Sequence, residues 1–465
     1  MESINNSRPL LSLAKPCLAT LIACSLFMTA CGKQENDEAA KEAFSSTYQA
    51  LESAPVFIQN ATILLGNGEK LNEANILLKD GKIEAVGKRV KSVKGAIEID
   101  ATGKYVTPGV IDTHSHLGVY PSPGTRSHRD GNEAVAPVTA DVWAEHSVWP
   151  QDPGFITALA GGVTSMQILP GSANLFGGRS VTVKNVPAHT YQAMKFPGAP
   201  HGLKMACGEN PKRVYGDKGG PQTRMGNVAG YRRAWIDAAD YLKKSEAAAE
   251  GSEPPKRDLK LETLAGVLKG EILVHNHCYR ADEMATMLDL AKEFDYKVTS
   301  FHHAIEAYKI GDLLAANDTC ASMWADWWGF KMEAFDMVRE NIPMVEAAGA
   351  CAIVHSDSGK GIQRLHQEAA KAMASGQRVG LDYDEATAIS WITQNPAKAL
   401  GILEHTGTLE EGKMADVVLW SDSPFSVYTH AEKVFVDGAL IYDRFDESKQ
   451  PVTDFSLGVL NFGAE

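Results

Sequence analysis

The stretch PGVIDTHSH, residues 108–116, decides the fold class expected for this chain. Val110 to Thr113 form a short run typical of a buried strand, and histidines follow at positions 114 and 116. Residues two apart on a strand face the same side of a sheet, so both imidazoles point the same way. At the carboxyl end of a barrel strand, such a pair can reach one divalent metal ion.

Three more apolar runs along the chain end in histidines. His275 and His277 close the first of these runs, and His302 and His303 close the second. The third ends in His355-Ser356-Asp357. Together with the first stretch, these strand ends hold seven of the 14 histidines in the chain. Such a distribution predicts side chains that meet at the open face of one barrel.

The long middle of the chain, from about residue 105 to 400, alternates apolar runs with amphipathic helical stretches. Strand and helix alternation over this length predicts an α/β fold, specifically a (β/α)8 TIM-type barrel. No G-x-G-x-x-G sequence follows an early strand, which disfavours a doubly wound sheet. Near both ends, Asp80-Gly81 and Asp437-Gly438 close short β-type runs. Because Asp-Gly is a strong hairpin signal, we expect a small sheet domain built from both ends.

The composition excludes several classes of protein. The chain has 465 residues, of which 44% are hydrophobic and 22% charged, so we expect a globular protein. The net charge is −13 and no dense run of Lys or Arg occurs, so we expect no nucleic-acid partner. A small-molecule substrate is the expected partner, and a homo-oligomer stays open.

The N-terminal segment predicts export. An apolar run from Cys17 to Ala30 follows Arg8 and Lys15, which is typical of a secretory signal. Met28 to Cys31 resembles the lipobox of bacterial lipoproteins, with an ordinary cleaved signal as the alternative. The resemblance implies a lipid at Cys31 that anchors the protein in the cell envelope, at the outer membrane facing the periplasm. The scattered cysteines 207, 278, 320 and 351 form no C-x-x-C pair, so we expect buried fillers rather than disulfides or a thiolate zinc site.

Several motifs together resemble the amidohydrolase superfamily, in its imidazolonepropionase-like and prolidase-like branch. They are residues 108–116, AGGVTS at 160–165, His303, Asp357, TQNPAKALG at 393–401 and GTLEEGKMAD at 407–416. The resemblance runs from about residue 56 to 442 and implies a metal-bearing barrel with a small β-sandwich from both ends. The expected parts are a signal peptide (1–30), a tether (31–54), the first part of the sandwich (55–106), the barrel (107–400), the second part of the sandwich (401–447) and a tail (448–465).

The same resemblance implies a set of metal ligands. His114 and His116 would bind the first ion, and one of His275 and His277 would be a ligand. His303 matches the histidine ligand on the sixth barrel strand of the family better than His302 does. Asp357 would be a ligand and the proton shuttle. The cofactor implied is a divalent metal, with zinc expected, as one ion or two.

The sequence does not decide which residue would bridge two metal ions. Lys204, carbamylated, would supply a bridging carboxylate as in many relatives with two metals. Glu209 in the following loop is the alternative, and a site with one metal needs no bridge. An unmodified Lys would repel the metals, so a role for Lys204 requires the modification.

Substrate contacts and reaction type are expectations of the same kind. Arg213, Tyr215 and Asn174 are candidate substrate contacts in polar loops, and Trp324, Trp327 and Trp328 either wall an apolar pocket or serve packing. The expected function is metal-dependent hydrolysis of an amide or cyclic amide C–N bond. The alternatives are a prolidase-like dipeptidase, for which Arg213 would clamp a carboxylate, and a metal-free binding lipoprotein without catalysis.

Overall fold

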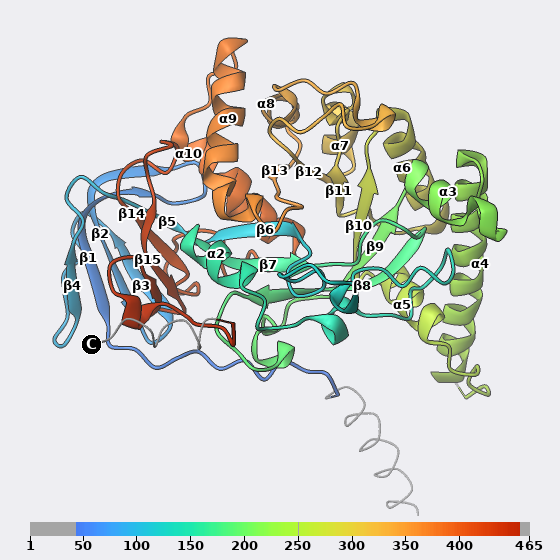
Figure 1. The fold of residues 1–465 in the computed structure, drawn as a ribbon, viewed down its shortest axis with the longest axis horizontal. Helices are drawn as coiled ribbons and strands as arrows, with labels where there is room; N and C mark the ends of the chain where they lie inside the picture. Colours follow the sequence, from blue (N-terminus) through green and yellow to red (C-terminus); the bar gives the residue numbers. More distant parts are fainter. Residues whose placement is uncertain (1–42, 250, 456–465) are drawn as a thin grey trace, which may run out of the picture. The chain divides into compact units, whose positions relative to one another are not determined.

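The computed structural model describes residues 43–249 and 251–455. The predicted signal peptide, the lipidation site Cys31, the first half of the tether and the last ten residues of the tail lie outside the described residues. From Ser46 onward the described chain forms one compact unit that contains two large sheets (Figure 1). The segment boundaries expected from the sequence stay predictions.

The first sheet is a nearly closed barrel of eight strands. Its order is β13-β12-β11-β10-β9-β8-β7-β6. The last strand meets the first, because the Asp357 backbone N–H donates to the His114 carbonyl at 3.0 Å. The strands are β6 (Val110–Ser115), β7 (Val163–Ile168), β8 (Phe176–Lys184), β9 (Gly202–Ala206), β10 (Leu273–Cys278), β11 (Ser300–His303), β12 (Cys320–Met323) and β13 (Ala352–Val354).

One strand departs from the regular repeat that the sequence predicted. β8 runs antiparallel to both β7 and β9, whereas the other neighbouring strands of this sheet pair in parallel. An antiparallel partner is reached through a short loop and needs no helical crossover. Residues 169–175 form that loop, so the described chain has no α-helix between β7 and β9. The barrel of eight strands agrees with the expected fold class, and the alternation of strand and helix expected for a (β/α)8 barrel is interrupted at the third strand.

Helices cover the outside of the barrel and follow most of its strands (Figure 1). Close packing at the strand starts is visible at Gly109, where an added Cβ would lie 1.9 Å from the Thr164 hydroxyl oxygen, so only glycine fits. The helices are α2 (Gly154–Ala160), α3 (Glu209–Tyr215), α4 (Arg224–Ala249), α5 (Leu259–Leu268), α6 (Ala281–Phe294), α7 (Gly311–Ala316), α8 (Asn341–Ala347), α9 (Leu365–Arg378), α10 (Glu385–Ala388) and α11 (Gln394–Ala399).

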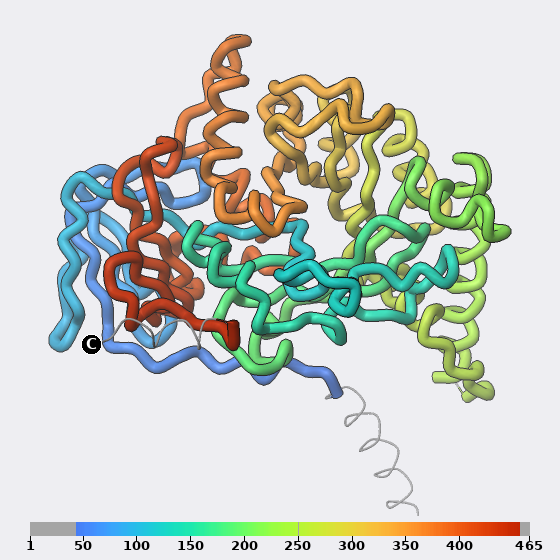
Figure 2. The backbone as a smooth tube through the Cα atoms, viewed as in Figure 1, coloured from blue at the N-terminus to red at the C-terminus, as the bar shows by residue number. Residues whose placement is uncertain are grey.

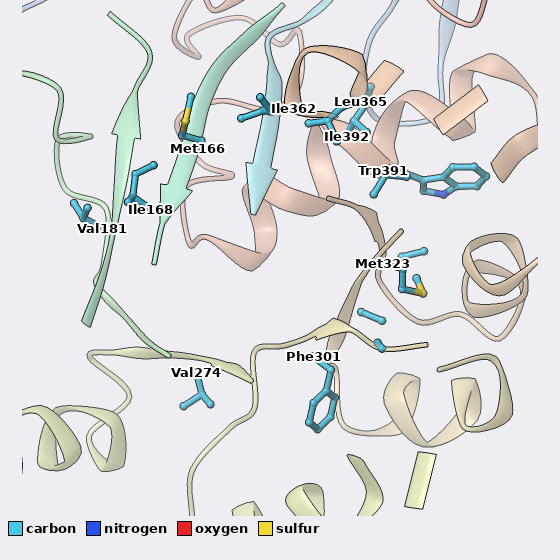
Figure 3. Packing of buried hydrophobic residues seen from close by; sticks show 14 of the residues in the cluster. Met166, Ile168, Val181, Val274, Phe301, Met323, Ile362, Leu365, Trp391 and Ile392 are labelled. Carbon is cyan, nitrogen blue, oxygen red and sulfur yellow. The ribbon is translucent and has the colours of Figure 1, made fainter. Parts of the chain in front are cut away.

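The barrel core is apolar and shared between strands and helices. Met166 and Ile168 of β7, Val274 of β10 and Phe301 of β11 are fully buried (Figure 3). Ile362, Leu365 and Trp391 from the last helical part lie in the same cluster. This continuous packing fixes the strand ends on which the polar residues stand.

The second sheet joins both ends of the chain, as the sequence predicted. Its order is β16-β15-β14-β5-β1-β2-β3, and β4 pairs with β1. The blue and red ends lie side by side in Figure 2, where β5 pairs antiparallel with β14 and Thr107 faces Val418. A two-layered sandwich stays a prediction. The strands are β1 (Val56–Leu64), β2 (Lys70–Lys79), β3 (Lys82–Gly87), β4 (Ile97–Asp100), β5 (Tyr105–Pro108), β14 (Val417–Trp420), β15 (Ala431–Val436) and β16 (Ala439–Asp443).

A buried ion cluster connects the two sheets. The Lys184 ammonium at the end of β8 lies 3.2 Å from Asp416 Oδ1 and 2.7 Å from Asp437 Oδ2. Its side chain is 0% exposed, and Tyr48 donates a hydrogen bond to Asp437. Two carboxylates from the terminal sheet thus neutralise one cation from the barrel.

The four described cysteines form two disulfides, which corrects the expectation of unpaired buried fillers. Cys207 bonds Cys278, with Cα atoms 5.2 Å apart, and Cys320 bonds Cys351, with Cα atoms 4.4 Å apart. Each pair bridges neighbouring barrel strands that are 71 and 31 residues apart in the chain. Local spacing could not show these pairs, because their proximity arises only when the sheet forms.

In the described part of the chain, no helix is both long and apolar enough to span a membrane.

Candidate metal centre

The carboxyl ends of β6, β11 and β13 bring three histidines around one carboxylate. His116 Nε2 lies 3.3 Å and His114 Nε2 lies 3.6 Å from Asp357 Oδ1. His303 Nε2 lies 3.9 Å from Asp357 Oδ2. Ligand atoms of His114, His303 and Asp357 all lie within 4.8 Å of one another, which suits a shared ion. The structure therefore brings together four of the residues that the sequence selected as ligands.

Lys204 of β9 contacts the same cluster of ligand residues. Its Nζ lies 3.3 Å from His114 Nε2, and its side chain is 1% exposed. Burial lowers the pKa of Lys204 to about 7, so much of the amine is uncharged at neutral pH. Glu209, the alternative bridging residue, lies at the start of α3 and pairs with Lys331 at 3.5 Å. The geometry thus favours Lys204 over Glu209 as the residue facing the ligands.

The structure separates the two histidines of β10, which strand parity alone could not. His275 Nδ1 bonds His302 Nε2 at 2.9 Å, and His302 Nδ1 contacts His114 Nδ1 at 2.8 Å. This buried chain uses both nitrogens of His302. The His277 ring lies 4.7 Å from the His303 ring, and its Nε2 lies 3.3 Å from Asn210 Nδ2. One buried nitrogen of each β10 histidine, His275 Nε2 and His277 Nδ1, has no hydrogen-bond partner among the described residues. The ring contact with His303 makes His277 the better candidate ligand of the two, whereas His275 contacts His114 through His302.

Other contacts fix the orientation of the ligand imidazoles. His116 Nδ1 lies 2.9 Å from the Leu169 carbonyl, which directs Nε2 toward Asp357. His355 Nε2 lies 3.1 Å from His303 Nδ1 in the same way. The structure thus gives His355, absent from the predicted ligand set, a positioning role. Its place at a histidine-rich strand end was the available signal.

Asp112 is a second supporting residue that the sequence reading missed. Its Oδ1 accepts hydrogen bonds from the backbone N–H groups of His114, at 3.0 Å, and Ser356, at 3.1 Å. The Ser356 hydroxyl donates to its other oxygen. Burial raises the pKa of Asp112 to about 6. Asp112 thus joins the first and last strand ends of the barrel, and its position inside the 108–116 stretch was the only signal in the sequence.

Two of the convergent residues have a strained backbone conformation. His303 and Asp357 have φ values of 70° and 46°, in the left-handed region that favours glycine. Such conformations cost on the order of 1–3 kcal/mol each and persist where the surroundings enforce them. The surrounding fold thus enforces these conformations at two of the predicted ligands, as it does at several positions elsewhere in the described chain.

The protonation states suit cation binding. Burial, followed by neighbouring positive charge, holds the pKa of His114, His277 and His303 well below the usual value. Burial would raise the pKa of Asp357, but the hydrogen bond and charge of His116 keep it below its usual value. Neutral imidazoles beside an ionised carboxylate are the form in which these side chains bind metal. The donor set present therefore fits a divalent metal.

The three candidate substrate contacts are placed differently. Asn174 Nδ2 donates to Tyr215 Oη at 2.7 Å, and both side chains are buried. Asn174 also donates to the carbonyls of Glu133 and Ala136, so this pair braces a loop, and the structure gives it no contact with the ligand histidines within the described residues. Arg213 is exposed on α3, in the segment that follows β9. It stays a candidate.

Comparison with known proteins gives consistent results. The family model described as "Amidohydrolase family" matches residues 271–441. Amidohydrolase tasK from Hapsidospora irregularis is 32% identical over 396 residues, which are 79% of this chain and 40% of that protein. An imidazolonepropionase from Mesorhizobium japonicum is 25% identical over 345 residues, 70% of this chain and 80% of its own length. The solved structure of an amidohydrolase from Thermotoga maritima is 35% identical with a TM-score of 0.78, and the match covers 84% of this chain and 100% of that one.

These matches place the chain among enzymes that hydrolyse C–N bonds. More narrowly, the chain belongs to the amidohydrolase family. It spans 40% of the length of amidohydrolase tasK, so that relative corresponds to this chain only in part.

Proposed function

We propose that this protein hydrolyses an amide or cyclic amide bond of a small molecule, with a divalent metal centre at the open end of the barrel. The observation that carries the proposal is the convergence of His114, His116 and His303 on Asp357, at 3.3–3.9 Å. The ligands are His114, His116, His277, His303 and Asp357, and zinc is the metal proposed. The match to an imidazolonepropionase, whose name denotes action on a ring amide, supports a cyclic substrate.

The bridging ligand proposed is carbamylated Lys204. Its uncharged amine would attack carbon dioxide, form a new N–C bond and release one proton, leaving a carbamate anion in place of a buried amine. The 3.3 Å distance from Lys204 Nζ to His114 Nε2 supports this role, because oxygens added at Nζ would lie beside the proposed ligands. The carbamate supplies the negative charge that two divalent ions need, which an ammonium group could not.

Asp357 would move the proton in the reaction. A divalent cation bound there supplies Lewis-acid activation of a water molecule and of the scissile carbonyl. Asp357 accepts the proton of the attacking water and passes it to the leaving nitrogen, so that the amine departs uncharged. Its ionised form at neutral pH suits the first of these steps, and His116 holds the carboxylate at 3.3 Å.

Metal analysis and a substrate panel test the proposal. We expect purified protein to contain one to two equivalents of zinc or a similar metal by mass spectrometry, and to hydrolyse members of a panel of hydantoins, cyclic imides and N-acyl amino acids. D357N should retain the fold and lose at least about 100-fold in kcat. A protein that binds no added zinc or manganese and hydrolyses nothing would contradict the proposal. Release of proline from dipeptides alone would favour the prolidase-like alternative.

We also propose that the protein is exported and anchored in the cell envelope through a lipid on Cys31. The N-terminal sequence pattern supports this, and so do the two disulfides, because disulfides persist in oxidising compartments. Labelling of expressing cells with a fatty-acid probe should mark the wild type and not C31A. Label on both proteins, or on neither, would contradict the anchor.

A further inference from the structure

The segment that follows β12, residues 324–335 and here called the mouth loop, begins directly against the ligand set. The Trp324 indole stacks on the His303 imidazole, with ring centroids 4.3 Å apart and planes 26° apart. Trp324 Nε1 donates to the Ser356 carbonyl at 3.2 Å, which fixes the indole in this position. The inner end of the mouth loop thus touches a proposed metal ligand.

Aromatic rings continue outward from this point. Trp324 lies 5.7 Å from Trp327 and 5.8 Å from Phe330, measured between ring centroids. Tyr279, just after β10, lies 5.3 Å from the His303 ring and 6.3 Å from Phe330. We call these four rings, Trp324, Trp327, Phe330 and Tyr279, the aromatic wall. They form a continuous apolar path from the ligand histidine to the surface.

The outer end of the mouth loop is exposed to an extent that packing alone does not require. Trp327 is 41% exposed and Phe330 is 57% exposed. Met332 and Phe335 follow, at 83% and 70%. Soluble proteins rarely gather exposed apolar side chains in one segment unless the segment binds something apolar. This distribution points to a binding role.

Polar anchors hold the mouth loop in this conformation. Glu333 is buried and pairs with Arg224 of α4. Its carboxylate lies against Gly208, where an added Cβ would be 2.6 Å from Glu333 Oε1. The Lys331 ammonium lies 3.3 Å from Asn210 Oδ1 and 4.2 Å from the centre of the Tyr279 ring. Because the charged residues turn inward to fixed partners, the aromatic residues are held in place at the surface.

We propose that the aromatic wall selects substrates that carry a large apolar or aromatic group next to the scissile C–N bond. This inference rests on the proposed hydrolase function, because it assigns the substrate class of the same site. The acceptor for such a group is the exposed face of Trp327 and Phe330, and Trp324 connects that face to His303. Burial of one phenyl group there should favour binding by about tenfold or more.

Two matched substrate pairs test this inference. N-acetylalanine with N-acetylphenylalanine, and 5-methylhydantoin with 5-benzylhydantoin, each differ by one phenyl group. We expect the wild-type, zinc-loaded protein to show at least about tenfold higher kcat/KM for the phenyl member of the hydrolysed pair. W327A and F330A should each reduce that preference at least about threefold, with metal content unchanged. Y428A is the matched control, because Tyr428 is 91% exposed in the loop between β14 and β15.

Binding measured without turnover separates the inference from the proposed function. In the metal-free wild type, titration with 5-benzylhydantoin should quench tryptophan fluorescence to saturation, and 5-methylhydantoin should not. F330A should lose this difference, whereas Y428A should keep it. Phenyl-selective binding without any hydrolysis would overturn the proposed function and retain only the part of the inference that makes the aromatic wall a phenyl-binding surface.

Three results would overturn the inference. The first is hydrolysis without preference for the phenyl member. The second is a preference that survives in both W327A and F330A. The third is an unchanged preference together with weaker binding of these variants to vesicles of phosphatidylethanolamine and phosphatidylglycerol, which would make the exposed face a membrane contact.

Discussion

Two lysines of the barrel are equally buried but differ in the partners of their amino groups. Lys184 of β8 is 0% exposed, and Lys204 of β9 is 1% exposed. Lys184 lies between two carboxylates, at 2.7 and 3.2 Å. Lys204 has no carboxylate within ion-pairing distance among the described residues, and its nearest polar contact given by the structure is His114. A paired buried lysine holds parts of a fold together. An unpaired buried lysine has a lowered pKa, so its amine loses the proton at a lower pH than usual and is available for chemistry.

The largest expected effect breaks the paired lysine. K184M leaves Asp416 and Asp437 buried without a cation, which should lower the free energy of unfolding by roughly 3–5 kcal/mol. Urea denaturation followed by circular dichroism measures this change. K244M is the matched control, because Lys244 pairs with Asp240 on the exposed surface and should contribute less than about 1 kcal/mol. Equal stability of K184M and K244M would contradict the role given to Lys184.

Removing the unpaired lysine should have the opposite profile. K204M should reduce kcat/KM by roughly 100- to 1,000-fold, because the bridging carbamate can no longer form. Its metal-free form should be at least as stable as the wild type at pH 7, because Met replaces a buried amine without a carboxylate partner. Mass spectrometry of the intact wild type under native conditions should show an added carbon dioxide that K204M lacks. Full activity in K204M would reject the carbamate.

The comparison extends to the two histidines of β10. H277A should weaken zinc binding more than about 100-fold, because it removes a proposed ligand whose ring lies 4.7 Å from the His303 ring. H275A should weaken it only about tenfold, because His275 acts on His114 through His302. Competition with a chromophoric chelator gives both affinities. A larger loss in H275A than in H277A would reverse the assignment.

The comparison also predicts a pH dependence of stability. The Lys204 pKa is about 7 in the folded protein and about 10.4 in an unfolded chain. Between these values only the unfolded chain holds the proton, so the free energy of unfolding should rise with pH, by up to about 1.4 kcal/mol per unit. Metal-free wild type in carbonate-free buffer should show this rise, relative to K204M, from pH 7 to 10. A difference between the two proteins that is flat over this range would contradict the pKa.

The sequence predicted which strand ends converge better than it predicted the barrel's detailed strand arrangement. Four separated strand ends carried His or Asp, and parallel strands in a barrel must bring such ends to one face. The reversal of β8 left no such pattern, because strand direction depends on loop length and sheet pairing. His275 and His277 share strand parity, so only depth inside the barrel distinguishes them. The disulfide of Cys207 with Cys278 was missed because nothing local encodes a partner 71 residues away.

The pairing of β5 with β14 has a consequence for how the chain reaches its native state. The terminal sheet is complete only when Thr107 pairs with Val418, which lies about 300 residues later in the chain. The barrel is thus an insertion within a sheet that β1 to β5 begin and β14 to β16 complete. A chain that emerges from a ribosome or an export channel cannot complete this sheet until nearly the whole chain has passed through. Contacts between residues so far apart in the sequence also form slowly. We therefore expect that losing a few dozen residues from the carboxyl end destabilises the amino-terminal strands first.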